Sequence, residues 1–279
     1  MREFILRPWK PEDRPQLKEL WKAAFGDSDE YIESFFACFL RGDTCVVAEA
    51  DGVVVSAMYI VPCIRLFPYR KNILTAGYTY ALATLPAYRG RGIGSAVYRA
   101  ACETAMKTAD AAFVLPAEAS LYPFYEKDGA APFGGVRELR VAKEELAGIP
   151  TRMTVRAPAG QYAGMREWYL SEMPHATFPD ELYDHLEASG MEFFMMEGGV
   201  AAAETEDGVC RILELLAPDI DGLTAIASVA RWCPAQEYIV RTPLFFDGPG
   251  DSRPFVLGTL KRIPDYPLPN DFWWGFGMD

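Results

Sequence analysis

The stretch Arg89-Gly-Arg-Gly-Ile-Gly94 is the most informative part of this chain. It follows an apolar extended run, Tyr78 to Leu85, and it opens a helical run, Ile93 to Lys107. Glycine at a strand-to-helix junction lets backbone N–H groups approach an anion, because no Cβ stands in the way. The helix N-terminus adds partial positive charge, and the two arginines add more. The stretch therefore predicts a cradle for a diphosphate.

Two common phosphate-binding patterns do not fit this stretch. A dinucleotide fingerprint, G-x-G-x-x-G, read from Gly90 has Ser95 in place of its third glycine, and a P-loop needs a G-K-[ST] that is not present. The pattern R-x-x-G-x-G, beginning at Arg89, does fit. Residues 82–94 closely resemble the acetyl-coenzyme A signature of the GNAT N-acetyltransferases. The alternative is a glycine-rich turn that only joins a strand to a helix.

The resemblance implies how the chain holds acetyl-CoA. It implies that the backbone of the cradle strand pairs with the pantetheine like an added strand, and that one N–H there polarises the thioester carbonyl. The residues in this role are Leu82, Ala83 and Thr84. It also implies that the loop and first helical turn hold the pyrophosphate. These residues are Arg89, Gly90, Arg91, Gly92, Ile93, Gly94 and Ser95, of which Arg91 either adds charge or points to solvent.

A candidate general acid lies further along the chain. The segment Leu121 to Gly129 resembles the family's "-YEK-GF" helix, whose tyrosine donates a proton to the leaving thiolate, and this tyrosine is Tyr125 here. A phenol with a pKa near ~10 suits a thiol leaving group near ~8.5. The match departs from the family after Gly129, and Glu118 replaces the usual asparagine. Tyr122 is a competing candidate, and Tyr125 could also be a buried helix aromatic.

No general base is evident in the sequence. Residues 75–84 contain no carboxylate, and we expect His175 and His185 to lie on exposed surfaces of the second half. Either a chain of waters or the chain terminus could then deprotonate the amine. The segment Trp273 to Asp279 is aromatic for a free end, so we expect it to dock. Eis-type acetyltransferases place a terminal carboxylate in the active site, and by this resemblance Asp279 is a candidate catalytic residue.

Composition and charge narrow the classes of partner. The 279 residues carry a net charge of −12, which argues against nucleic-acid binding because that needs a basic face. The six cysteines are scattered without a C-x-x-C, so we expect no metal site. Without a signal peptide or a long apolar run, we expect a cytoplasmic protein that binds no membrane. Acidic residues near the first two helices either attract an ammonium group or form a solvated face; they are Asp27, Asp29, Glu30 and Glu33.

The periodicity predicts an α/β fold with a mixed sheet, and the chain divides near residue 150. Residues 1–145 alternate strands and helices in the order of a GNAT fold, and they form the predicted acetyl-CoA-binding catalytic domain. Residues 142–150 read as a linker. Residues 151–279 repeat the same order more faintly and lack R-x-x-G-x-G. We interpret them as a degenerate GNAT-like domain, the alternative being an unrelated α+β domain.

Two classes of function follow. The first is an acetyl-CoA-dependent N-acetyltransferase that moves an acetyl group to a primary amine of a small molecule or peptide, directly and through a tetrahedral intermediate. The second is a non-catalytic coenzyme A-binding regulatory module. Binding alone does not need a tyrosine acid, so the presence of Tyr125 favours the enzyme. The oligomeric state is not predicted.

Overall fold

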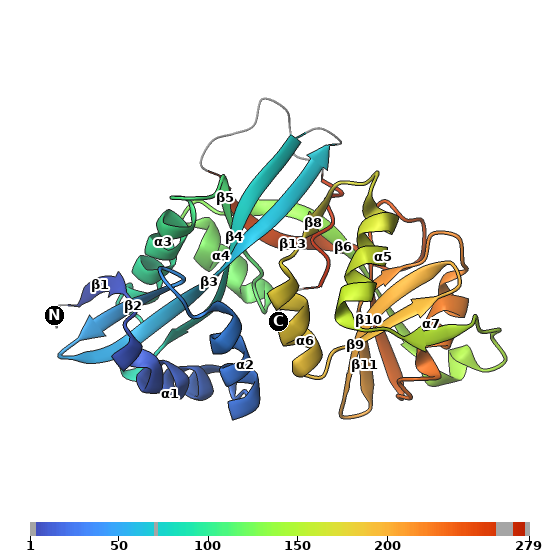
Figure 1. Ribbon diagram of the computed structural model, residues 1–279, viewed down its shortest axis with the longest axis horizontal. Coiled ribbons are helices and arrows are strands. Elements are labelled where there is room, and N and C mark those ends of the chain that lie inside the picture. Colours follow the sequence, from blue (N-terminus) through green and yellow to red (C-terminus); the bar gives the residue numbers. More distant parts are fainter. Residues whose placement is uncertain (1–3, 70–71, 261–269, 277–279) are drawn as a thin grey trace.

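The computed structural model describes residues 4–69, 72–260 and 270–276. They form a mixed α/β fold with two lobes (Figure 1). The first half of the chain contributes β1 (Ile5–Pro8), α1 (Arg14–Phe25), α2 (Asp29–Phe39), β2 (Cys45–Ala50), β3 (Val53–Tyr69), β4 (Asn72–Thr84), α3 (Ile93–Ala105), β5 (Ala111–Val114), α4 (Tyr122–Glu126) and β6 (Ala131–Ala142). The second half contributes β7 (Thr154–Arg156), α5 (Ala159–Leu170), β8 (His175–Thr177), α6 (Asp180–Ala188), β9 (Glu192–Met196), β10 (Gly199–Glu206), β11 (Val209–Leu216), α7 (Gly222–Ala230), β12 (Glu237–Pro243) and β13 (Asp251–Leu260).

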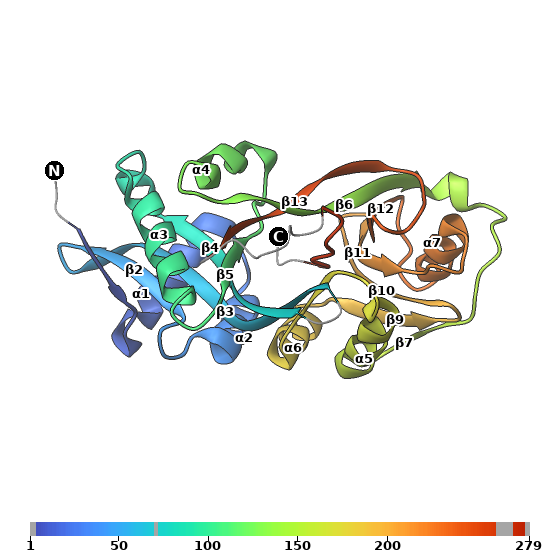
Figure 2. The same ribbon diagram turned by 90° about the horizontal axis from the view of Figure 1, so that it is seen from above.

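One sheet runs through both lobes. Its strands follow the order β1-β2-β3-β4-β5-β13-β6-β12-β11-β10-β9-β7, and β8 pairs with β3 outside this path. β13 comes late in the sequence but lies between β5 and β6, antiparallel to both. Figure 2 shows β6 and β13 side by side, running from one lobe to the other. The second half of the chain therefore completes the sheet of the first half.

Local signals in the sequence place the elements well. Ser28 caps α2, because its hydroxyl accepts a hydrogen bond from the backbone N–H of Tyr31 at 3.2 Å. Asp51-Gly52 has positive φ at both residues, +52° and +78°, as a type I′ hairpin turn requires. Asp207-Gly208 has the same pattern, at +48° and +78°. These turns fix the register of β2 against β3 and of β10 against β11.

The described part of the aromatic C-terminal segment docks against the rest of the protein, as the sequence predicted. Phe272, Trp273, Trp274 and Phe276 are at most 1% exposed. The indole N–H of Trp273 donates to the Glu214 carboxylate at 2.5 Å, and the Trp273 backbone bonds to residues on both sides of His175. Residues 277–279, and Asp279 with them, lie outside the described residues.

The second half also contains a buried ion pair. The guanidinium Nε of Arg166 donates to the Glu214 carboxylate at 2.8 Å, and both side chains are fully buried. The hydroxyl of Tyr162 donates to the same carboxylate. Because a buried charge is costly unless it is paired and hydrogen-bonded, this network holds α5, β11 and the C-terminal segment in fixed relation. Within the described residues, no helix is long and apolar enough to cross a membrane.

Both histidines are buried, and the expectation that they lie on exposed surfaces is wrong. His175 is 3% exposed, and its Nε2 lies 3.0 Å from the Glu167 carboxylate. His185 is fully buried between α6 and α2, where its Nδ1 lies 3.0 Å from the hydroxyl of Ser34. The polarity of histidine suggested exposure. However, the contact between the two halves covers the ring of His185, and the docked C-terminal segment pairs with the strand that carries His175.

Candidate functional site

The cradle strand β4 separates from its parallel neighbour before it reaches the glycine-rich stretch. β4 pairs with β5 only from Ala76 to Tyr78, opposite residues 111–113. Beyond that point Ala81 adopts a φ of +52°, and the register against β3 shifts there. A non-glycine residue at positive φ marks a bulge that redirects the backbone. The backbone of Leu82 to Thr84 thus leaves the β4–β5 ladder, as strand-like pairing with a bound chain would require.

The loop after β4 is held in place by its own arginines. The Nε of Arg89 donates to the carbonyl oxygen of Thr84 at 3.0 Å, which ties the loop to the end of the strand. The guanidinium carbon of Arg91 lies 5.3 Å from the ring centroid of Tyr88. Gly90 and Gly92 have φ of +73° and +76°, a region that L side chains rarely adopt. The turn itself therefore favours glycine at these two positions.

Helix α3 begins at this loop with an open N-terminus. Gly92 is its N-cap, and no side chain caps it among the described residues. The first N–H groups of an α-helix have no partner within the helix, and they carry partial positive charge. Ile93, Gly94 and Ser95 form this first turn, and all three line one pocket. The turn can thus present its amides to a bound anion.

This pocket, which we call the donor pocket, has a volume of about 580 Å³ and is bordered by α1, β4, α3 and α4. All but one of the residues predicted to hold acetyl-CoA line it, the exception being Arg91. The described residues that line it include two cations, Arg89 and Lys127, and no carboxylate. Both the charge and the open helix N-terminus suit a diphosphate. The residues present therefore fit coenzyme A.

A second pocket, the acceptor pocket, adjoins the first and has a volume of about 610 Å³. It lies between β4 and β5 and is closed by residues of the second half. Its described lining includes three carboxylates and no Lys or Arg: Asp27 from the loop before α2, and Glu204 and Glu206 from β10. The two pockets share Phe25, Leu82, Leu121 and Tyr125.

Tyr125 therefore lies where the two pockets meet. Its ring packs edge-on against Tyr98, with ring centroids 4.9 Å apart, and its side chain is 7% exposed. Burial, with a smaller contribution from Cys102, raises the pKa of Tyr125 to about 12. The hydroxyl thus keeps its proton throughout the neutral range.

The competing tyrosine has a different environment. The hydroxyl of Tyr122 lies 3.1 Å from the carbonyl oxygen of Pro254 and 3.2 Å from that of Phe255, to which it donates. These bonds fasten α4 to β13, so a strand from the second half positions the helix that carries Tyr125. Glu118, in place of the family's asparagine, accepts a hydrogen bond from the hydroxyl of Ser120.

The acidic residues of the first two helices separate into two groups. Asp29 and Glu33 pair with Lys18, at 3.2 and 3.0 Å, and link α1 to α2. Asp27 instead lines the acceptor pocket and accepts a hydrogen bond from the Trp21 indole at 2.7 Å. Of the two tyrosines on one face of β4, Tyr80 lines this pocket. Tyr78 packs in the core against Trp274.

Sequence reasoning missed Glu204 and Glu206 as site residues. Their only signal is an acidic strand end before the turn at residues 207–208. That signal is typical of any solvated hairpin, and only the packing of the second lobe against the first brings these two carboxylates to the pocket.

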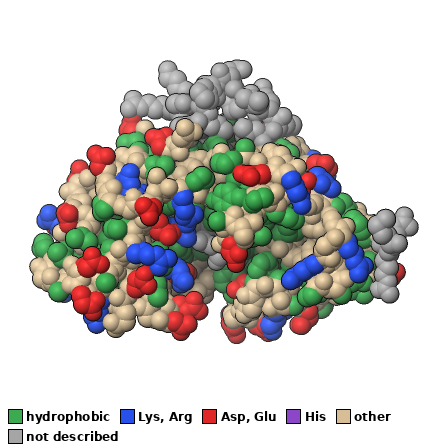
Figure 3. Space-filling view, turned by 180° about the vertical axis from the view of Figure 1, so that it is seen from behind, with side chains coloured by type: hydrophobic (Ala, Val, Ile, Leu, Met, Phe, Trp, Pro, Cys, Tyr) green, Lys and Arg blue, Asp and Glu red, His purple; other side chains and the backbone are tan. Residues whose placement is uncertain are grey.

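On the face shown in Figure 3, acidic and basic side chains are interspersed over both lobes.

Comparisons with known proteins point to one family. A family model described as "Acetyltransferase (GNAT) domain" matches residues 6–133. Among curated proteins, none matches the chain.

Solved structures resemble nearly the whole chain. A GCN5-related N-acetyltransferase from Kribbella flavida is 15% identical with a TM-score of 0.68, over 92% of this chain and 72% of that chain. Eis1 from Mycobacterium abscessus is 11% identical with a TM-score of 0.63, over 92% and 73%. A putative acetyltransferase from Pyrococcus horikoshii is 17% identical with a TM-score of 0.60, over 99% and 95%. At these identities the likeness establishes the fold, and the chain carries, over residues 6–133, a domain of the GNAT acetyltransferase family.

Proposed function

We propose that this protein is an acetyl-CoA-dependent N-acetyltransferase that transfers an acetyl group directly to a primary amine. One observation carries the proposal: two pockets of opposite charge meet at the hydroxyl-bearing ring of Tyr125. The basic donor pocket suits the diphosphate of coenzyme A. The acidic acceptor pocket suits an amine, which is a cation in water. Family membership supports acyl transfer, and the two pockets support this donor and this class of acceptor.

The donor side anchors and polarises the thioester. The amides of the first turn of α3 and the guanidinium of Arg89 hold the diphosphate. The backbone of Leu82 to Thr84, which has left the β4–β5 ladder, pairs with the pantetheine, and one of its N–H groups donates to the carbonyl oxygen on which negative charge develops. An amide fixed by the bulge at Ala81 needs no reorganisation during the reaction.

The acceptor side supplies an uncharged amine and removes its proton. Asp27, Glu204 and Glu206 line the pocket, so carboxylates can take the proton either directly or through water. Asp279, outside the described residues, stays a proposed alternative. The amine nitrogen then forms a bond to the carbonyl carbon, and collapse of the tetrahedral intermediate breaks the carbon–sulfur bond.

Tyr125 protonates the departing thiolate. Its raised pKa keeps the phenol neutral, so the acid form is fully populated at neutral pH. Because Tyr125 borders both pockets, its phenol can reach the thiolate in the donor pocket while the amine enters from the acceptor pocket. The partners we propose are thus acetyl-CoA and a small-molecule or peptide amine, in the cytoplasm.

The test is release of free thiol from acetyl-CoA with a panel of primary amines. We expect turnover by the wild type and a fall of about 100-fold or more in kcat for Tyr125→Phe, with unchanged affinity for coenzyme A. Tyr122→Phe is the comparison, because its hydroxyl lines neither pocket and only fastens the same helix to β13, so we expect a smaller loss than in Tyr125→Phe. Unchanged kcat in Tyr125→Phe would remove Tyr125 as the acid. Tight coenzyme A binding without turnover across a broad panel would make the protein a coenzyme A-binding module.

A further inference from the structure

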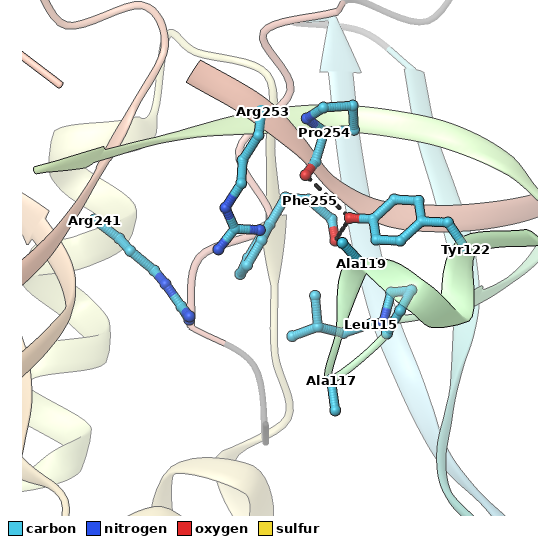
Figure 4. Close-up of a pocket in the computed structure, with 9 residues that line it drawn as sticks. Leu115, Ala117, Ala119, Tyr122, Arg241, Arg253, Pro254 and Phe255 are labelled. Atoms are coloured by element: carbon cyan, nitrogen blue, oxygen red, sulfur yellow. Dashed lines mark hydrogen bonds between the residues drawn. The ribbon is translucent and has the colours of Figure 1, made fainter. Parts of the chain in front are cut away.

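A third pocket lies beside the acceptor pocket and carries positive charge. It has a volume of about 370 Å³, and it shares Leu115 and Ala117 with the acceptor pocket. Its described lining includes two arginines, Arg241 from β12 and Arg253 from β13, and no carboxylate. The rest of the wall is mostly apolar, with Phe255 behind and the ring of Tyr122 at one side. Figure 4 shows both guanidinium groups directed toward the space that Leu115 and Tyr122 border.

The sheet register fixes the two arginines on one face. Arg241 on β12 lies directly opposite Glu138 on β6, and Asp251 on β13 lies opposite Glu138 from the other side. Arg253 follows Asp251 by two residues, so its side chain lies on the same face of the sheet. Glu138 accepts hydrogen bonds from the Nε of Arg241 at 3.3 Å and from a terminal nitrogen of Arg253 at 3.1 Å. The carboxylate thus holds both cations in place.

Aromatic contacts orient the guanidinium groups further. The guanidinium carbons of Arg241 and Arg253 lie 5.2 and 5.7 Å from the ring centroid of Phe255. The Arg241 side chain is 11% exposed, so it is held almost rigidly, whereas the Arg253 side chain is 43% exposed. A guanidinium has five N–H donors, and Arg253 shares its donors with Glu138 and the Tyr122 hydroxyl, so donors remain on Arg253 for an anion in the pocket.

Both neighbouring pockets border the helix that carries the acid. Tyr122 lines the third pocket, which we call the arginine pocket, and Tyr125 lines the acceptor pocket. The two tyrosines lie one turn apart on α4. A molecule with its amine beside Tyr125 can therefore extend past Leu115 and Ala117 to reach Arg253.

We propose that the arginine pocket binds an anionic group of the acyl acceptor, so that the acceptor carries a primary amine at one end and a carboxylate or phosphate-like group at the other. This inference rests on the proposed function for the position of the amine. The acidic acceptor pocket selects the amino end, and the planar guanidinium groups select the anionic end. An acceptor lacking the anion leaves this second pocket unused.

The experiment compares acceptors that differ in the length of chain between the amine and the anionic group. Thiol release is measured with glycine, β-alanine, γ-aminobutyrate and ε-aminocaproate, each paired with the alkylamine of equal chain length, and with aminoalkylphosphonates to separate carboxylate from phosphate recognition. We expect KM for the best amino acid to be about ten- to hundred-fold lower than for its alkylamine, with an optimum at one chain length. We expect Arg253→Gln to remove this ratio and Arg253→Lys to restore part of it.

Arg140→Gln is the matched control. Arg140 lies on β6, pairs with Glu237 at 2.9 Å and is 64% exposed, so its loss removes an arginine without touching the pocket. We expect its amino-acid-to-alkylamine ratio to equal that of the wild type. Equal KM values for both acceptors in the wild type, or a ratio that survives in Arg253→Gln, would overturn the proposal.

A binding measurement separates this proposal from the proposed function. The N-acetyl derivatives of the same amino acids are titrated calorimetrically into protein saturated with coenzyme A, in wild type, Arg253→Gln and Arg140→Gln. Binding that depends on Arg253 supports the anion site even if no acceptor is turned over, in which case the proposed function alone fails. No binding in any protein, with coenzyme A affinity intact, would overturn the anion site.

Discussion

The same strand–helix–strand unit occurs twice in this chain, and only one copy suits a diphosphate. In the first half, β4 leads to α3 and then to the parallel strand β5. In the second half, β11 leads to α7 and then to the parallel strand β12. Each unit places a helix N-terminus at the end of a strand. The topology is therefore common to both, and what differs is the chemistry at the helix start.

The first junction leaves its amides open, and the second covers them. Gly92 starts α3 without a side-chain cap among the described residues, and Arg89 lies beside it. At α7 the carboxylate of Asp221 accepts a hydrogen bond from the backbone N–H of Thr224 at 3.0 Å. That carboxylate fills the position an anionic ligand would take and repels further negative charge. A helix N-terminus thus becomes an anion site only when the sequence leaves it empty and adds cations.

The two halves also differ in where they put their charges. In the first half, Arg89 and Lys127 line the donor pocket. In the second half, Arg166 and Glu214 are fully buried against each other. The two cations of the first half border a pocket, whereas this buried pair of the second half fixes its own core.

The largest effect is expected from breaking that buried pair. Glu214→Gln removes the fully buried counter-charge of the Arg166 guanidinium and leaves only the more exposed Glu167 carboxylate, so we expect the free energy of unfolding to fall by about 3–5 kcal/mol. Urea unfolding followed by tryptophan fluorescence measures it. The surface variant Glu237→Gln, which removes an exposed partner of Arg140, should change stability by no more than about 0.5 kcal/mol. Equal losses in the two variants would show that the buried pair contributes no more to the free energy of unfolding than the exposed pair does.

The contact between the halves gives the next largest effect. His185 on α6 packs against Tyr31 and Phe35 of α2, and burial lowers its pKa to about 4. In the unfolded chain a histidine titrates near ~6.5, so between these values the unfolded state binds more protons. We expect acidification from pH ~6.5 to pH ~4 to remove up to about 3 kcal/mol of stability through this group.

The variant His185→Gln isolates that contribution. Glutamine can still bond to Ser34 but does not titrate, so its stability should fall less steeply with acid than that of the wild type. Urea unfolding across this pH range measures both slopes, and the carboxylates common to both proteins cancel in the difference. Identical slopes would mean that the joint between the halves is insensitive to His185.

Transplanting the second junction's cap into the first is a direct test of the comparison. Gly92→Asp places a carboxylate at the start of α3, as Asp221 does at α7, and Asp tolerates positive φ better than most residues. We expect coenzyme A affinity, measured by calorimetry, to fall about 100-fold, or about 2.7 kcal/mol. Gly92→Asn is the matched control, since it has the same shape without the charge, and its loss should be much smaller. Equal losses would mean that backbone strain, and not charge, excludes the ligand.

The contrast between the halves also marks what the sequence could predict. The cap at Ser28, the turn at Asp51-Gly52 and the open junction at Gly92 are encoded by neighbouring residues, so they could be predicted from local pattern. The insertion of β13 between β5 and β6 could not, because its partners are more than 100 residues away in the chain. The short strand β8 was missed for the same reason, since its partner β3 lies in the other half.

The candidate site divides in the same way. The residues that the sequence predicted to hold acetyl-CoA come from one continuous segment, residues 82–95, and all of them except Arg91 line the donor pocket. The acidic wall of the acceptor pocket and the arginines of the adjoining pocket come from β10, β12 and β13. Their chemistry appears only when the second half is placed against the first. Which of them acts on the acceptor stays a proposal, as does the division of the chain into domains at residues 145–151.

The smallest effect should come from removing the cap that closes the second junction. Asp221→Ala deletes the hydrogen bond to the Thr224 amide and a favourable charge at the start of α7, so we expect a loss of about 1 kcal/mol in the free energy of unfolding. Coenzyme A binding at the donor pocket should be unchanged, and calorimetry should still give one site per chain. The second junction has no counterpart of Arg89, and an open helix N-terminus without cations lacks much of what holds a diphosphate. A second coenzyme A site in Asp221→Ala would show that the cap alone had distinguished the two halves. Arg89 and the bulge at Ala81 would then contribute less to coenzyme A binding than we assign to them.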